Sequence, residues 1–280
     1  MRYRECYEKG VRRLQEADVP EAGLNALLLL EYVCGTGRSD LLAHGDRPLS
    51  LGQMEQYEEM FAKRAKRMPL QQITGEQEFM GLAFRVNRNV LIPRQDTEIL
   101  VEQALKALKP GMRILDLCTG SGCILISLLA FAPECSGLGV DISAGALEVA
   151  VENAERILAE GSMRADWLQS DLFEQVEDVY HVITANPPYI PTGALEGLMP
   201  EVRDYEPVLA LDGREDGLFF YRRIAREAER YLCRGGMLFL EIGAEQASDV
   251  RQLLAQNGFA DIKVYQDYAG LDRVVRACVP

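Results

Sequence analysis

A regular alternation of helical and extended segments from residue 96 onward most constrains how this 280-residue chain can fold. The expected strands lie at 113–118, 136–141, 165–170, 179–185, 236–242, 261–266 and 272–279. The expected helices lie at 96–108, 122–131, 143–160, 217–233 and 244–257. Strands joined through helices become parallel neighbours, so the pattern predicts an α/β fold with a doubly wound, mostly parallel sheet. Gly270 separates the last two strands, which are expected to pair antiparallel.

The first seventy residues follow a helical pattern instead. A Leu-rich stretch at 21–34 predicts one helix, and Ser39 and Ser50 are expected to cap two more. Alternating apolar residues over 73–93, around a Met-Gly turn, predict a β-hairpin. The expected organisation is a helical domain at 1–70, a β-hairpin linker at 71–95 and an α/β domain at 96–280.

Composition limits the kinds of partner and the compartment. The net charge is −13, and residues 1–70 carry equal numbers of acidic and basic side chains, so the excess acid lies in residues 71–280. An acidic α/β domain repels a phosphate backbone, which disfavours a nucleic-acid substrate. Seven scattered cysteines without a C-x-x-C pair, and only two histidines, predict neither disulfides nor a metal site. No apolar stretch is long enough for a membrane span or a signal segment, so we expect a cytoplasmic protein.

A glycine-containing turn follows the strand at 113–118. Cys118, Thr119, Gly120, Ser121 and Gly122 lead from this strand directly into a helix. Glycines there let a ligand approach the backbone, and the start of the helix offers unpaired N–H groups. The third glycine of a dinucleotide-binding loop is missing, so a dinucleotide is disfavoured.

Two acidic residues follow the next two strands. Asp141 lies about twenty residues beyond the glycine turn, where a carboxylate can accept hydrogen bonds from two ribose hydroxyls. The alternative is that Asp141 caps the helix that begins near Ser143. Asp171 precedes Leu172 and Phe173, where apolar side chains could bracket an adenine ring; the alternative is an ordinary turn aspartate.

Asn186, Pro187, Pro188 and Tyr189 follow the strand at 179–185. The two prolines remove two N–H donors and stiffen the corner, which leaves carbonyl acceptors, the Asn186 amide and the Tyr189 ring. Such a corner suits a planar substrate with an NH2 group, because the Asn186 oxygen and the Pro187 carbonyl can each accept one N–H. The alternative is a Pro-rich turn that only ends the strand.

These segments together resemble class I S-adenosylmethionine-dependent methyltransferases that methylate amino groups. Further segments resemble the HemK family in particular, and they are Pro69–Gly75, Leu91–Glu98, Glu206-Pro207, Ala210–Gly213 and Ala269–Val275. Members of that family methylate the side-chain nitrogen of the glutamine in the Gly-Gly-Gln loop of peptide chain release factors. The resemblance implies a Rossmann-like, seven-stranded methyltransferase sheet, preceded by a small helical domain and a hairpin. Residues 1–70 are charge-balanced, helical and separated from the sheet by the hairpin, as expected of a domain that docks a folded protein substrate.

The resemblance also implies roles for the residues already described. S-adenosylmethionine is expected to contact Cys118–Gly122, Asp141, Asp171, Leu172 and Asn186, while Asn186–Tyr189 bind and orient the glutamine, with Asn186, Pro187 and Tyr189 as catalytic residues. Arg94 and Glu206 are expected to be structural. Three alternatives stay open: a glutamine of a ribosomal protein as substrate, adenine N6 of a nucleic acid as substrate, and an adenosyl-binding module without catalysis.

Overall fold

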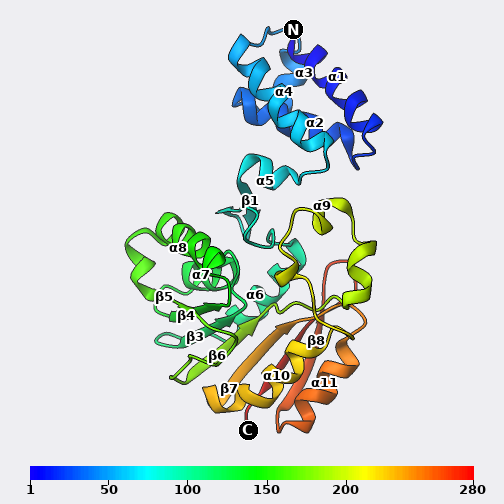
Figure 1. Ribbon diagram of the computed structural model, residues 1–280. Helices are drawn as coiled ribbons and strands as arrows, with labels where there is room; N and C mark the ends of the chain where they lie inside the picture. The colour runs from blue at the N-terminus through cyan, green and yellow to red at the C-terminus, as the bar shows by residue number, and fades with distance from the viewer. The chain divides into compact units, whose positions relative to one another are not determined.

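The computed structural model describes residues 1–280 and divides them into two compact units. Unit 1 consists of Met1–Gly75 together with Met199–Tyr205, and unit 2 consists of Glu76–Leu198 and Glu206–Pro280 (Figure 1). The segment that follows the Asn-Pro-Pro-Tyr corner therefore contributes seven residues to the helical unit before the chain returns to the α/β unit.

Unit 1 is built from helices around a small apolar core. The helices are α1 (Tyr3–Glu16), α2 (Ala22–Cys34), α3 (Arg38–Ala43), α4 (Leu51–Ala65), α5 (Leu70–Thr74) and α9 (Pro200–Arg203). Leu14, Leu30 and Phe61 are fully buried in the core. Ser50 caps α4 as predicted, because its Oγ accepts from the Gln53 N–H at 3.2 Å. The cap predicted at Ser39 is wrong, because α3 begins at Arg38 and Ser39 lies within its first turn.

Glu201 ties the segment Met199–Tyr205 to the rest of unit 1. Its carboxylate accepts from Arg64 at 2.9 Å and from Arg67 at 2.6 Å. Burial raises the pKa of Glu201, but the hydrogen bonds from Arg67 and Arg64 outweigh burial and lower the pKa to about 2. The Tyr205 hydroxyl donates to the Lys66 carbonyl at 2.6 Å, so both ends of the segment are fixed.

Unit 2 begins with the predicted β-hairpin. Strands β1 (Glu76–Phe79) and β2 (Leu82–Arg85) pair antiparallel around Met80-Gly81. The hairpin starts later than the predicted linker, because α5 occupies residues 70–74. The Met80 N–H donates to the Glu98 carboxylate at 2.7 Å, which fastens the turn to α6 (Glu98–Leu105).

A seven-stranded sheet forms the centre of unit 2, as predicted. Its strands are β3 (Arg113–Leu117), β4 (Ser136–Asp141), β5 (Ala165–Gln169), β6 (Tyr180–Ala185), β7 (Leu232–Glu241), β8 (Ala260–Gln266) and β9 (Asp272–Cys278). Their order is β5-β4-β3-β6-β7-β9-β8. The strands from β5 to β7 are parallel, and β9 pairs antiparallel with both of its neighbours. Strand β7 begins four residues before its predicted start.

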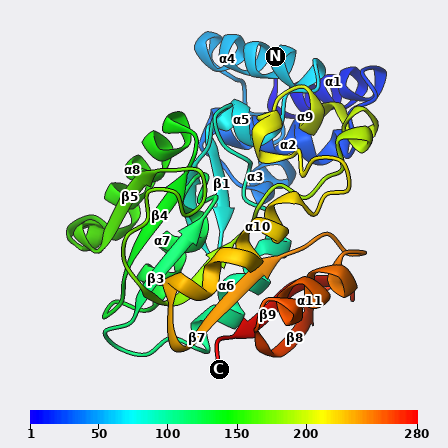
Figure 2. The same cartoon turned by 60° about the horizontal axis from the view of Figure 1, so that its bottom comes forward.

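Helices cover both faces of this sheet (Figure 2). The helices are α6, α7 (Cys123–Phe131), α8 (Ala144–Leu158), α10 (Phe219–Glu227) and α11 (Ala247–Gln256). Side chains of α6, α7 and α8, among them Leu100 and Leu125, pack in one apolar cluster, and side chains of α10 and α11, among them Ile224 and Leu254, pack in another. The predicted helix at 96–108 is shorter, with a 3-10 turn at Gln95–Thr97 before α6. None of the helices combines the length and the apolar character that a membrane span requires.

The strand order changes direction between β3 and β6. From β3 the chain moves outward to β4 and β5, and it then crosses to β6 on the other side of β3. Ligands of open α/β sheets bind beyond the carboxyl ends of the strands at such a switch point. The loop after β3 and the corner after β6 therefore meet at this point.

Candidate active site

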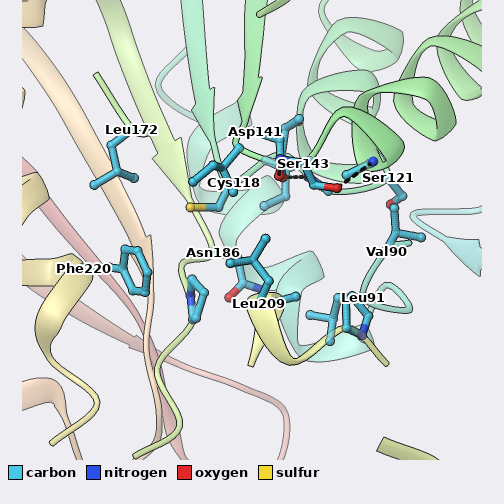
Figure 3. Close-up of a pocket in the computed structure, with 18 of the residues that line it drawn as sticks. Val90, Leu91, Cys118, Ser121, Asp141, Ser143, Leu172, Asn186, Leu209 and Phe220 are labelled. Atoms are coloured by element: carbon cyan, nitrogen blue, oxygen red, sulfur yellow. Dashed lines mark hydrogen bonds between the residues drawn. The ribbon is translucent and has the colours of Figure 1, made fainter. Parts of the chain in front are cut away.

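A cavity of about 250 Å³ lies at this edge of the sheet in unit 2. Figure 3 shows side chains of three origins around it: Cys118 and Asp141 from strand ends, Val90 and Leu91 from the segment after β2, and Leu209 and Phe220 from later segments. The predicted residues that line it are Cys118, Thr119, Gly120, Ser121, Asp141, Asp171, Leu172, Asn186 and Pro188. Gly122, Pro187 and Tyr189 are not among the lining residues.

Buried hydrogen bonds hold the glycine loop in place. Asp116 is fully buried, and its carboxyl accepts from the hydroxyls of Thr119 at 2.6 Å and Thr184 at 2.7 Å. Burial raises the pKa of Asp116 to about 7, although the two hydroxyls oppose this shift. Asn153, fully buried on α8, donates to the Ser121 carbonyl at 3.0 Å. The loop therefore keeps its shape through contacts on both sides.

Gly122 has a packing role rather than a place on the cavity wall. Its φ is +77°, and a Cβ there would lie 2.7 Å from Cδ1 of Ile126 and 3.0 Å from the ring of Trp167. Gly120 also has a positive φ, of +56°, but a Cβ there would meet only the Cys118 carbonyl, at 4.0 Å. Space around Gly120 thus stays open on the cavity side.

Asp141 connects the loop to β4. Its Oδ2 accepts from the Gly120 N–H and its Oδ1 from the Ser143 N–H, both at 2.9 Å. Burial raises the pKa of Asp141, while the N–H groups of Ser143 and Gly120 lower it. Ser143, rather than Asp141, caps α8, because the Ser143 hydroxyl accepts from the Ala146 N–H at 3.2 Å. Asp141 is therefore positioned on the wall of the cavity and not as a helix cap.

Asp171 and Leu172 form the wall beyond β5. The Asp171 carboxylate accepts from Arg223 of α10 at 2.7 Å, so it is ion-paired rather than an isolated turn residue. Leu172 has a φ of +52° and lines the cavity, and Figure 3 shows it on the same side as Phe220. Phe173 stacks instead on Tyr231, with ring centroids 4.6 Å apart. An apolar slot thus involves Leu172 and Phe220, and the sequence did not indicate the latter.

The Asn-Pro-Pro-Tyr corner presents Asn186 to the cavity. The Asn186 Nδ2 donates to the Thr97 hydroxyl at 3.4 Å, and no protein donor contacts its Oδ1. The Tyr189 carbonyl accepts from Gln246 at 3.1 Å, and burial raises the pKa of the Tyr189 hydroxyl to about 12. A Cβ at Gly213 would lie 2.7 Å from the Tyr189 Cα, so this backbone is packed tightly.

Arg94 and Glu206 fix the opposite wall. Glu206 is buried, and its Oε2 accepts from Arg94 at 2.6 Å while its Oε1 accepts from the Ile92 N–H at 3.4 Å. Arg94, Thr97, Arg214 and Phe220 line the cavity but were not assigned to it from the sequence. The segment Leu91–Glu98 did carry a signal, because it was one of those that resemble a family motif.

The cavity offers different chemistry along its length. The Ser121 hydroxyl is buried and has no hydrogen-bond partner, Asp141 supplies a carboxylate, and Leu172 and Phe220 supply apolar surface. A molecule with a polar end, a ribose and a flat ring fits this set. No cluster of three or more His, Cys, Asp or Glu side chains is placed to hold a metal ion.

Comparison with known proteins identifies the family of the chain. Residues 5–75 match the family described as the PrmC N-terminal domain, and residues 95–198 match the methyltransferase small domain. A release factor glutamine methyltransferase of Geobacter sulfurreducens is 44% identical over 94% of this chain and 91% of its own. One from Cereibacter sphaeroides is 41% identical over 100% of this chain and 99% of its own.

A solved structure supports the fold. The crystal structure of a methyltransferase from Pyrococcus furiosus has a TM-score of 0.54 at 17% identity, over 71% of this chain and 89% of that one. Because identity of this level indicates only a shared fold, the assignment depends on the two nearly full-length relatives. The chain belongs to the family of release factor glutamine methyltransferases.

Proposed function

We propose that this protein transfers the methyl group of S-adenosylmethionine to the side-chain nitrogen (N5) of the glutamine in the Gly-Gly-Gln motif of peptide chain release factors. The observation that carries the proposal is Asn186, whose Nδ2 is held by Thr97 while its Oδ1 has no protein donor. Family membership supports the same reaction, since the similar proteins are named release factor glutamine methyltransferases.

The cavity residues suit S-adenosylmethionine. The Asp141 carboxylate would accept from the ribose hydroxyls, and it has acceptor sites left after its two backbone bonds. The Ser121 hydroxyl would bind a polar group of the amino acid part, and Leu172 and Phe220 would pack against the adenine. When bound, this cofactor supplies a methyl group activated by the adjacent sulfonium.

Asn186 would act by orienting the amide. A glutamine nitrogen is a weak nucleophile, because its lone pair is delocalised into the carbonyl. Asn186 Oδ1 and the Pro187 carbonyl would each accept one N–H, which turns the lone pair toward the methyl group. The methyl group supplied by the cofactor would pass to this nitrogen, leaving the electron pair of the former S–C bond on sulfur, and the nitrogen would then lose one proton to water. Positioning is therefore the main contribution of this corner.

Tyr189 has a supporting part in this proposal. The Tyr189 ring does not line the cavity and its hydroxyl is buried, so Tyr189 would brace Pro188, which does line the cavity.

We further propose that the helical unit docks the release factor outside the active site and that the protein works in the cytoplasm. A comparison of intact release factor with a short Gly-Gly-Gln peptide tests docking, and a far larger kcat/KM for the intact protein supports it.

The reaction itself is tested by incubating the protein with methyl-labelled S-adenosylmethionine and a release factor. Mass spectrometry of fragments should place one methyl group on the Gly-Gly-Gln glutamine. A Gly-Gly-Glu release factor is the matched control and should stay unlabelled. Label on a ribosomal protein or on DNA adenine, with the release factor unlabelled, would contradict the proposed substrate.

A further inference from the structure

Two buried residues lie directly behind Asn186. Strands β6 and β7 are parallel neighbours with Ala185 opposite Leu240, so the residues that follow, Asn186 and Glu241, lie side by side at the carboxyl ends of these strands. Glu241 is the last residue of β7 and is 1% exposed. Thr97, at the start of α6, is 2% exposed and lines the cavity.

The Thr97 side chain interacts with both of the other side chains. Its hydroxyl oxygen accepts from Nδ2 of Asn186 at 3.4 Å. Burial raises the pKa of Glu241 to about 7, and the Thr97 hydroxyl, the Arg273 cation and the Asn186 amide all lower it. The carboxyl therefore faces the polar groups of Thr97 and Asn186, yet its Oε2 has no hydrogen-bond partner.

Arg273 contacts the residues next to Glu241 and Thr97. Its guanidinium donates to the Ile242 carbonyl, next to Glu241, at 3.2 Å and to the Asp267 carboxylate at 3.0 Å. It also lies 3.6 Å from Asp96, the neighbour of Thr97. Two sequence motifs, Leu91–Glu98 and Ala269–Val275, thus meet behind the Asn-Pro-Pro-Tyr corner.

The buried Glu241 carboxyl is not explained by a contribution to folding stability. A buried carboxyl with an unsatisfied oxygen costs free energy, and an apolar side chain of similar volume is often neutral or stabilising at such a place. The contacts of Thr97 and Glu241 point instead to the orientation of the Asn186 amide. If that amide turned over, its NH2 group would face the N–H groups of the acceptor, and donors would meet donors.

We propose that Thr97 and Glu241 are positioning residues for methyl transfer: the Glu241 carboxylate accepts from the Thr97 hydroxyl, whose oxygen accepts from Asn186, so that Asn186 Oδ1 faces the acceptor. This inference rests on the proposed function, since it assigns the amide of Asn186 to the acceptor. Neither residue exchanges a proton with the substrate. The pair fixes the direction of one amide.

The first test compares Thr97→Val, which replaces the hydroxyl by a methyl group, with Thr97→Ser, which keeps it. We expect Thr97→Val to lower the single-turnover rate at saturating S-adenosylmethionine and release factor by about 10²-fold, as misplacement of a reacting group typically does. Thr97→Ser should restore most of the rate. The Kd for S-adenosylmethionine, measured by calorimetry, should stay at the wild-type value in both variants.

The second test separates positioning from structure. Glu241→Met removes the acceptor but keeps the volume, so we expect a higher Tm together with a transfer rate about tenfold lower. Glu241→Gln keeps one acceptor oxygen and should retain most of the rate. A role in stability alone predicts the opposite for Glu241→Met, namely a lower Tm and an unchanged rate.

The outcomes distinguish this inference from the proposed function. Wild-type rates in Thr97→Val and Glu241→Met, with a slow Asn186→Ala, overturn the positioning role and leave the proposed function intact. A loss of cofactor affinity that matches the loss of rate overturns it as well, because the residues would then act on the cofactor site. Should Asn186→Ala itself transfer at the wild-type rate, the proposed role of Asn186 fails first.

Discussion

Replacement of Asp141 by alanine should weaken S-adenosylmethionine binding without unfolding the α/β unit. A carboxylate has about four acceptor sites. In Asp141, the N–H groups of Gly120 and Ser143 occupy two of these sites. The remaining sites can serve two ribose hydroxyls. Hydrogen bonds to a charged group contribute about 1.5–3 kcal/mol, so the Kd should rise about 10- to 150-fold.

Stability should change less than binding. The alanine variant loses two hydrogen bonds from backbone N–H groups, but it also removes a carboxyl whose pKa burial raises, and these effects oppose each other. Isothermal titration calorimetry gives the Kd, and urea unfolding of the free protein checks the fold. Asp178→Ala is the control, because it removes an exposed ion pair with Arg113 in the same unit. An unchanged Kd in a folded Asp141→Ala variant would refute the assignment to the ribose.

Three further predictions concern stability. Glu201→Gln should lower the free energy of unfolding of unit 1 by about 1.5–3 kcal/mol at neutral pH, since it breaks charged hydrogen bonds, while the exposed control Asp204→Asn should not. Because the Glu201 pKa is lowered to about 2, this contribution should be lost as the pH falls from about 4 toward about 2, which urea unfolding can follow.

Asp116 should give a pH dependence of stability with the opposite sign, because its folded-state pKa is raised to about 7. The folded protein keeps a proton that the unfolded chain releases, so the free energy of unfolding should fall between about pH 4 and pH 7. Asp116→Asn should flatten this dependence. Gly122→Ala should cost about 1 kcal/mol more than Gly81→Ala, because both positions have a positive φ but only at Gly122 would the new Cβ meet other atoms. Equal Tm values for these two alanine variants would contradict the close packing at Gly122.

Local patterns allowed much of the fold to be predicted. Strands and helical segments alternate along most of unit 2, and both this alternation and the hairpin at Met80-Gly81 follow from near neighbours in the sequence. Strand ends were less certain: β7 starts early at Leu232, where only pairing with Tyr180 of β6 makes the segment extended. The cap predicted at Ser39 was wrong because Gly37 is the N-cap residue, with its N–H bonded to the Asp40 carboxylate, and the helix begins at Arg38.

The site was predictable where residues follow strand ends, and it was not where distant segments meet. Asp141 and Asn186 stand at strand ends, so the sheet brings them to one edge. Phe220 and Arg223 lie on a helix with the apolar and charged faces that surface helices commonly have, so the sequence pattern does not mark them as binding residues. Only the fold places them at the cavity. The sequence pattern places Glu241 only at the end of a buried strand. Its position behind Asn186 depends on the register of β6 against β7, which the sequence does not indicate.

The role of Asn186 in methyl transfer to glutamine is the central claim, and single-turnover transfer by Asn186→Ala tests it most directly. Enzyme in excess over release factor, at saturating S-adenosylmethionine, reports the transfer step alone. We predict a rate about 10²–10³-fold below that of the wild type, as for loss of a positioned polar group in an active site, with the cofactor Kd nearly unchanged. A folded Asn186→Ala protein that methylates the Gly-Gly-Gln glutamine at the wild-type rate would contradict the account.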